Sequence, residues 1–155
     1  MKRTLFFFAV VFLTLPSCTV LKVVVPPEAY SLDTAIFVLE TRDHILSDVK
    51  EIDSYEGVEM KGKVAVFETD YGPVFLYVYK GEEAKKIWKK LNSRAGFVSI
   101  RSVLDLPNMG KFSTVSDGKK IIAWWRKNWL FVVEGKNGVE EFVKHVYRVY
   151  EEMKR

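Results

Sequence analysis

Few side chains in this chain of 155 residues are suited to metal binding. The two histidines, His44 and His145, each fall on a predicted helix. Asp48 follows His44 by four residues, and Glu141 precedes His145 by four. Acid–histidine pairs at this spacing are common on helix surfaces and are usually structural. We therefore expect no metal site.

Nucleophilic catalysis finds equally little support. Ser113 and Ser116 closely precede Asp117, and a distant histidine could complete a triad in space. Neither serine stands in a G-x-S-x-G turn, which exposes the nucleophile in many hydrolases. Residues 135–138 (GKNG) precede a predicted helix but lack the length and the Lys-Ser/Thr ending of a phosphate-binding loop. The sequence thus predicts no catalytic residue and no cofactor.

Aromatic side chains are the remaining candidates for binding. Too many of them fall in the predicted strands for all to enter one core without crowding. Rigid aromatic surface suits the binding of sugars, peptides or partner proteins, and an arginine beside it adds a polar contact. We expect some of these residues to line a groove or lie at the surface as a candidate binding patch, whereas core packing is the favoured interpretation for each member taken singly. Its residues are Trp124, Trp125, Arg126, Trp129, Tyr77 and Tyr79.

The first 18 residues have the pattern of an export leader. Lys2 and Arg3 precede residues 5–15, an apolar run interrupted only by Thr14. This run is about half as long as the ~20 residues of a membrane-spanning helix. Residues 15–18 (LPSC) resemble the bacterial lipobox, whose cysteine is acylated before the leader is cleaved.

The lipobox resemblance implies that residues 1–17 are a lipoprotein-type signal peptide and that Cys18 carries the lipid. Several acyl chains on one residue anchor a protein stably. Residues 18–30 would then be the tether, stiffened by two consecutive prolines, and residues 31–155 one globular domain. Plain secretion after a later cleavage and an uncleaved anchor are the alternatives. We expect an exported protein at the bacterial cell membrane or outer membrane.

The composition restricts the partners of the chain. Two of its 24 basic residues lie in the leader, so 22 basic side chains face 20 acidic ones in the remainder. This near-neutral, interspersed charge argues against a nucleic-acid partner. The chain has no glutamine and is rich in Lys and Glu, a bias typical of heat-adapted proteins. Its single cysteine excludes a disulfide within the chain.

The elements that position these residues centre on residues 117–135 (DGKKIIAWWRKNWLFVVEG). Residues 119–126 and 129–134 are predicted strands with two apolar faces, which places them in the middle of a covered sheet. Asp117-Gly118 favours a tight hairpin before the first strand. Lys127-Asn128 joins the two strands, and we expect Asn128 to supply the positive φ of that turn.

The rest of the chain is predicted to contain both strands and helices. Its expected strands lie at 34–40, 63–69, 73–80, 97–100 and 111–116, its helices at 43–54, from residue 82, and at 139–154, and a loop at 104–110. One long helix from Ser31 is the alternative to a strand at 34–40, because periodicity does not separate the two.

This order predicts an α+β fold, a mainly antiparallel sheet of about five or six strands packed with two or three helices. A strand pair running into a helix that opens Gly-Glu-Glu-Ala (81–84), then a Trp-bearing meander and a final long helix, resembles the PsbP-like superfamily over residues 34–155. The chain is also similar to a small family of bacterial lipoproteins of unknown function. The PsbP resemblance implies a binding module without shared catalytic residues, so no site residue transfers.

We therefore expect an extracytoplasmic lipoprotein that is a non-enzymatic binding or scaffold module for a partner protein or an envelope component. A carrier of a small apolar ligand between sheet and helices is one alternative, and it requires a dry internal cavity. A hydrolase with a concealed site is another, and it requires a cleft in which a histidine meets Ser or Asp.

Overall fold

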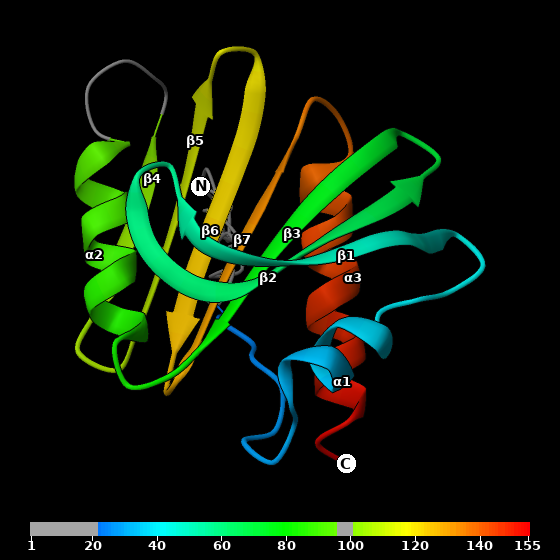
Figure 1. The fold of residues 1–155 in the computed structure, drawn as a ribbon, viewed down its shortest axis with the longest axis horizontal. Coiled ribbons are helices and arrows are strands. Elements are labelled where there is room, and N and C mark those ends of the chain that lie inside the picture. The colour runs from blue at the N-terminus through cyan, green and yellow to red at the C-terminus, as the bar shows by residue number, and fades with distance from the viewer. Residues whose placement is uncertain (1–21, 96–100) are drawn as a thin grey trace, which may run out of the picture.

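The computed structural model describes residues 22–95 and 101–155. Their elements are α1 (Leu32–Phe37), β1 (His44–Tyr55), β2 (Val58–Thr69), β3 (Gly72–Lys80), α2 (Ala84–Arg94), β4 (Ser102–Leu106), β5 (Met109–Ser116), β6 (Lys119–Arg126), β7 (Trp129–Gly135) and α3 (Val139–Glu152). Within these residues, seven strands form one antiparallel sheet in the order β1-β2-β3-β7-β6-β5-β4. Helices α2 and α3 lie on opposite sides of its central strands (Figure 1). The predicted α+β class is confirmed, with more strands than expected.

The two strands predicted to be central do occupy the centre of the sheet. β7 is the middle strand, β6 is its neighbour, and every residue of β7 is buried. Their side chains alternate as predicted, with Trp124 and Phe131 in the cluster under α3 and Trp125 and Leu130 in the cluster under α2. A strand with two apolar faces needs cover on both sides, and the two helices supply it.

The tight turns that flank β6 agree with the sequence in one case and differ in the other. Asp117 (φ 51°) and Gly118 (φ 74°) both adopt the left-handed conformation that a type I′ hairpin requires. In the turn between β6 and β7, however, the positive φ lies at Lys127 (54°) and not at Asn128 as predicted.

The sequence-based prediction is wrong for most of residues 34–54. Residues 34–40 form no strand, because α1 begins after Ser31, whose Oγ accepts a hydrogen bond from the Thr34 amide (3.1 Å). The long-helix alternative is right only as far as Phe37. The predicted helix at 43–54 is instead β1, whose pairing with β2 shifts register twice. Each shift interrupts the two-residue alternation of a strand and leaves apolar residues at helix-like spacing.

Residues 104–110 are likewise not a loop. They belong to a hairpin of β4 and β5, which turns at residues 107–108. β4 forms one edge of the sheet, and four of its five residues are exposed, among them Val103 and Leu106. Pro107 and Gly110 indicate a loop from sequence, but Pro107 lies in the turn and Gly110 lies inside β5. The short strand expected at 97–100 lies outside the described residues.

α3 covers one face of the sheet. Its buried stripe contains Val139, Phe142, Val143, Val146, Val149 and Tyr150, as predicted, whereas Met153 is exposed. The hydroxyl of Tyr150 donates a hydrogen bond to the carbonyl oxygen of Ala35 (2.6 Å), which joins α3 to α1. Phe67, Trp124, Trp129 and Phe131 of the sheet pack beneath the two helices. This face is a filled aromatic core.

The segment before α1 is part of this core. Val23, Val24 and Val25 are only 1–2% exposed and pack in the α3 cluster. The indole of Trp124 donates a hydrogen bond to the Val24 carbonyl oxygen (2.9 Å), and the Arg126 guanidinium donates one to that of Val23 (3.2 Å). The tether predicted for residues 18–30 can therefore extend no further than residue 22.

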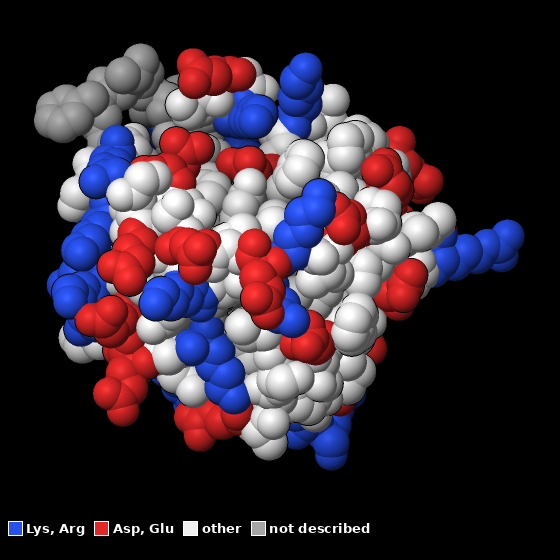
Figure 2. All heavy atoms as spheres, in the orientation of Figure 1, with Lys and Arg blue, Asp and Glu red and all other residues white. Residues whose placement is uncertain are grey.

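Charges of both signs are interspersed over the face shown in Figure 2. The lysines of α2 lie opposite its buried side, and Lys86, Lys89 and Lys90 are exposed, as expected for a solvated helix face. Lys85 instead donates a hydrogen bond to the Pro107 carbonyl oxygen (3.0 Å). No helix in the described part of the chain combines the length and apolarity that crossing a membrane requires.

Candidate ligand-binding site

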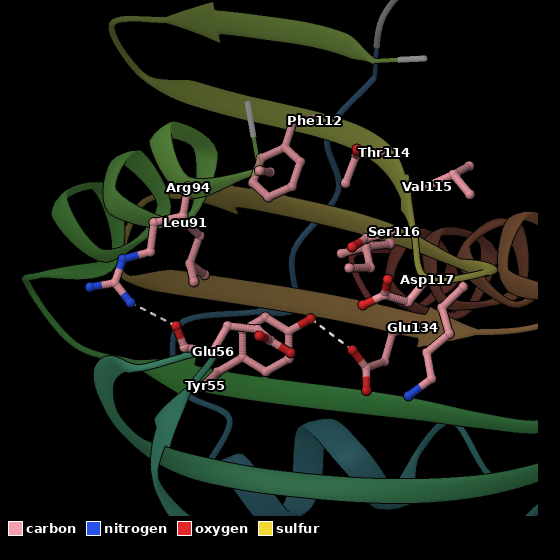
Figure 3. Close-up of a pocket in the computed structure, with 13 residues that line it drawn as sticks. Tyr55, Glu56, Leu91, Arg94, Phe112, Thr114, Val115, Ser116, Asp117 and Glu134 are labelled. Carbon is pink, nitrogen blue, oxygen red and sulfur yellow. Dashed lines mark hydrogen bonds between the residues drawn. The ribbon is translucent and has the colours of Figure 1, made fainter. Parts of the chain in front are cut away.

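A pocket of about 600 Å³ opens on the α2 face of the sheet (Figure 3). It lies between the end of α2 and strands β5, β6 and β7, and the end of β1 adds the remaining wall. Leu91, Phe112 and Ile121 supply apolar lining, and Arg94, Asp117, Lys119 and Glu134 supply charge. Among the described residues, α2 ends at Arg94 and covers only part of this face.

Glu134 is the buried charged residue of this pocket. The residue is only 8% exposed, although it is charged. It lies near the end of β7, whose preceding residues are all apolar. Residues 130, 132 and 134 of β7 share the α2 face, because side chains alternate along a strand. The carboxylate accepts hydrogen bonds from two tyrosines, Tyr55 Oη to Oε2 (2.8 Å) and Tyr77 Oη to Oε1 (3.1 Å).

The two tyrosines come from separate strands and pack against each other. Tyr55 ends β1 and Tyr77 lies in β3, and their ring centroids are 4.5 Å apart. Burial, reinforced by the negative charge of Glu134, raises the pKa of both hydroxyls above the ordinary value of 10. Both therefore remain protonated and act as donors, which fixes the orientation of the carboxylate.

Charged side chains of both signs line the pocket, and Lys119 follows Asp117 by two residues at the turn between β5 and β6. In Figure 3, Asp117 and Glu134 lie toward one end and Arg94 toward the other. Arg94 Nη1 donates a hydrogen bond to the Glu56 carbonyl oxygen (2.7 Å), which ties α2 to the turn between β1 and β2. Among the ion pairs formed by the described residues, none includes Glu134 or Asp117.

The concealed hydrolase considered from the sequence requires a histidine near a serine. The pocket lining contains the hydroxyls of Thr114 and Ser116 but no histidine or cysteine. A serine nucleophile needs a base within hydrogen-bond reach, and both histidines lie elsewhere, in a separate hollow beside α3. The serine–histidine arrangement that a concealed hydrolase requires is thus not formed in this pocket.

The two histidines meet each other instead. His44 lies in β1, not on a helix as predicted, and its ring stacks on that of His145 with centroids 3.8 Å apart and planes 9° apart. His145 Nε2 lies 2.8 Å from the Leu39 carbonyl oxygen and donates to it, so Nδ1 accepts from Arg148 Nη2 (3.1 Å). His145 is therefore neutral in this arrangement.

The surroundings of this pair disfavour protonation. Burial, followed by the proximity of His145, lowers the pKa of His44. Burial also lowers the pKa of His145, and the positive charge of Arg148 adds to the shift, against the hydrogen bond to Leu39. In the described ranges, no group of three or more His, Cys, Asp or Glu residues is placed to hold a metal ion.

The predicted aromatic patch is not formed. Trp124 and Trp129 are completely buried under α3, whereas Trp125 is buried under α2, on the opposite face. Core packing, the interpretation favoured for each residue singly, holds for the three tryptophans, because two helices on two faces accommodate more tryptophan than one core could. The indole nitrogens of Trp125 and Trp129 have no hydrogen-bond partner, which shows that packing determines their positions.

The other patch residues lie apart. Tyr77 contacts the candidate site through Glu134, and Tyr79 is a half-buried neighbour on the same strand. Arg126 contacts the N-terminal segment. Sequence reasoning missed Glu134 and Tyr55, although a lone acid ending a buried strand was a usable signal. Cys18 lies outside the described residues.

The chain is similar to a protein family and to a solved structure. A family model described as "Protein of unknown function (DUF3242)" matches residues 27–153. The chain belongs to this DUF3242 family. A solved structure from Thermotoga maritima, named a GTP binding regulator, is 90% identical to the chain. The match covers 84% of this chain and 94% of that one, with a TM-score of 0.79.

No match was found among curated proteins. The DUF3242 match spans every described element from α1 to α3.

Proposed function

We propose that this DUF3242 member is a non-enzymatic binding module, exported and held at a membrane by lipid on Cys18, that binds a small ligand or an exposed group of an envelope component. The observation that carries the binding function is the pocket on the α2 face, where a buried carboxylate is oriented by two tyrosines. Ligand sites commonly combine apolar walls with a few convergent polar groups, as this pocket does.

The alternatives expected from the sequence receive less support. A carrier of an apolar ligand needs a cavity between sheet and helix, but the α3 face is filled by stacked aromatic rings, with Trp124 and Phe131 centroids 5.2 Å apart. The α2 pocket has charged side chains in its lining, and its buried carboxylate disfavours a fully apolar ligand.

Binding in the pocket is tested by filling it. Ser116 is exposed and lines the pocket, so Ser116→Trp places a large ring there without disturbing the core. Small molecules that co-purify with the mature protein from an envelope fraction would be compared by mass spectrometry. We expect a molecule bound to wild type to be absent from Ser116→Trp and retained by Ser54→Trp, a matched change on β1 outside the pocket. Identical profiles for all three proteins would contradict the proposal.

Lipidation is tested separately. The lipobox resemblance of residues 15–18 supports a mature chain that begins at an acylated Cys18. Intact mass of the membrane-extracted protein should show acyl groups on that residue, and Cys18→Ala should remove them and release the protein from membranes. An unmodified amino terminus beyond Cys18 would exclude the anchor.

Guanine-nucleotide binding is a second candidate, favoured by the name of the Thermotoga maritima relative. The pocket itself fits a triphosphate poorly, because Asp117 and Glu134 oppose its charge and Arg94 is hydrogen-bonded to Glu56. Thermal unfolding with Mg²⁺-GTP, with Mg²⁺-ATP as the control, separates the two functions, because a ligand that binds the native state raises Tm. We expect no GTP-specific rise, and a rise seen with GTP alone would favour the second candidate.

A further inference from the structure

We propose that the pocket on the α2 face selects ligands that carry a protonated amine or guanidinium group on an apolar body, and that Glu134 and Asp117 receive the cation. This inference rests on the binding function proposed above and names its ligand class.

Glu134 supplies the first argument. A buried charge is costly unless it is paired and hydrogen-bonded. The hydrogen bonds from Tyr55 and Tyr77 use two of about four acceptor positions on the carboxylate. Neither hydroxyl brings a positive charge, and the ion pairs of the described residues leave Glu134 without a countercharge. A cationic ligand provides both the missing charge and additional donors.

Asp117 strengthens this selection. It occupies the tight turn between β5 and β6, and it lies toward the Glu134 end of the pocket in Figure 3. Two carboxylates at one end repel an anionic ligand and attract a cation. Lys119 lines the same end, because it is two residues from Ile121, the cross-strand partner of Glu134, but it is exposed and forms no ion pair with either carboxylate. Two carboxylates against one ammonium group still leave the Glu134 end with a net negative charge.

The remaining walls select an apolar body. Leu91 and Phe112 are 4% and 2% exposed, and Ile121 lies beside them in the lining. Apolar area buried on these walls adds to the affinity, whereas the cation fixes the orientation of the ligand. A pocket of about 600 Å³ is large enough for an aromatic or branched amine.

The test uses three probes of matched size: 2-phenylethylamine, 2-phenylethanol and 3-phenylpropanoate. Each would be titrated into the mature protein while the amide NMR signals of Asp117, Glu134 and their neighbours are followed. We expect the amine to shift these signals and to bind about tenfold or more tightly than the alcohol, because hydrogen bonds to charged groups are the strong ones. The carboxylate should cause no shift there.

Two variants complete the test. Glu134→Gln keeps the size of the side chain and one acceptor oxygen, and it should weaken binding of the amine about tenfold or more and reduce its advantage over the alcohol. Glu59→Gln makes the same change of charge on β2, outside this pocket, and should leave the affinity unchanged. A native-like spectrum of each variant shows that it is folded.

The outcomes separate this inference from the function on which it rests. Equal or tighter binding of the alcohol or the carboxylate in the pocket would overturn the cationic class and leave the binding function standing. The absence of any shift with the amine would also overturn it. The binding function fails as well only if wild type and Ser116→Trp retain the same molecules from the envelope fraction.

Discussion

The two faces of one sheet differ in how completely they are covered. On the α3 face, a helix of 14 residues, α1 and the N-terminal valines enclose an aromatic cluster. On the α2 face, a pocket lies beside a helix of 11 residues. The charged side chain of Glu134, near the end of β7, lines this pocket. The same central strands, β6 and β7, thus contribute stability on one side and a candidate recognition site on the other.

The largest expected effect concerns the valines that complete the α3 face. A chain that begins at Pro26 should lose about 5 kcal/mol of unfolding free energy relative to one that begins at Thr19, since each fully buried valine contributes roughly 1.5–3 kcal/mol. Urea denaturation of the two chains measures this difference. Coincident midpoints would show that the segment adds nothing to the closed face.

A pair of phenylalanines compares the two faces directly. Phe131 is completely buried beneath α3, whereas Phe112 forms a wall of the α2 pocket. Phe131→Ala should cost about 4 kcal/mol, within the usual range for such truncations, and Phe112→Ala should cost about 1 kcal/mol less because its surroundings can relax into the pocket. Equal losses in chemical denaturation would mean that both faces are packed equally tightly.

Substitution of Tyr55 and Tyr77 tests how much their hydrogen bonds to Glu134 contribute to the free energy of unfolding. Tyr55→Phe should lower the unfolding free energy by roughly 1.5–2 kcal/mol, because it removes a buried hydrogen bond to a carboxylate. Tyr77→Phe should cost about 1 kcal/mol, since Tyr77 is only half-buried and its bond is longer. In the Glu134→Gln background both costs should shrink, and unchanged costs would show that the rings alone matter.

The smallest effect is a pH dependence at the edge of the α3 face. His44 and His145 have pKa values below the ordinary 6.5, so the unfolded chain binds their protons more readily than the folded one. Their contribution to stability is therefore present above pH 6.5 and is lost as the pH falls below that value. Thermal unfolding should show this loss in wild type and a flatter profile in His145→Gln.

Glu140 provides the contrast for this pH profile. Its hydrogen bond and ion pair with Lys120 lower its pKa below the ordinary 4.5, so its contribution disappears only in more acidic solution. Glu140→Gln should leave the slope between pH 5 and 7 unaltered, given that ordinary value of 4.5. A slope that persists in His145→Gln would assign the effect to other groups.

The parts of the fold that the sequence predicted are those with the strongest periodicity. β6 and β7 are apolar on both faces, and α3 has an unbroken stripe, so local pattern and burial agree. β1 was mistaken for a helix because its two register shifts interrupt the alternation. β4 and the start of β5 were predicted as a loop because Pro107 and Gly110 interrupt the segment, although one lies in a tight turn and the other within a strand.

The candidate site was beyond sequence reasoning for a different reason. Glu134 meets Tyr55 across 79 positions of the chain and Tyr77 across 57, so only the order of strands in the sheet brings them together. The aromatic patch failed in the opposite way: its residues are neighbours in sequence, yet strand alternation sends Trp124 and Trp125 to opposite faces. Proximity in sequence and proximity in space diverge most in such a sheet.

The hydrogen bond from the Arg126 guanidinium to the Val23 carbonyl oxygen fixes the point at which the folded domain begins. This point limits how far the domain can lie from Cys18. Val23 follows Cys18 by five positions, and an extended chain spans at most about 3.6 Å per position, or roughly 18 Å in all. If Cys18 carries lipid, as proposed, so short a linker would keep the folded domain close to the lipid headgroups. It would also limit the directions in which the pocket can face.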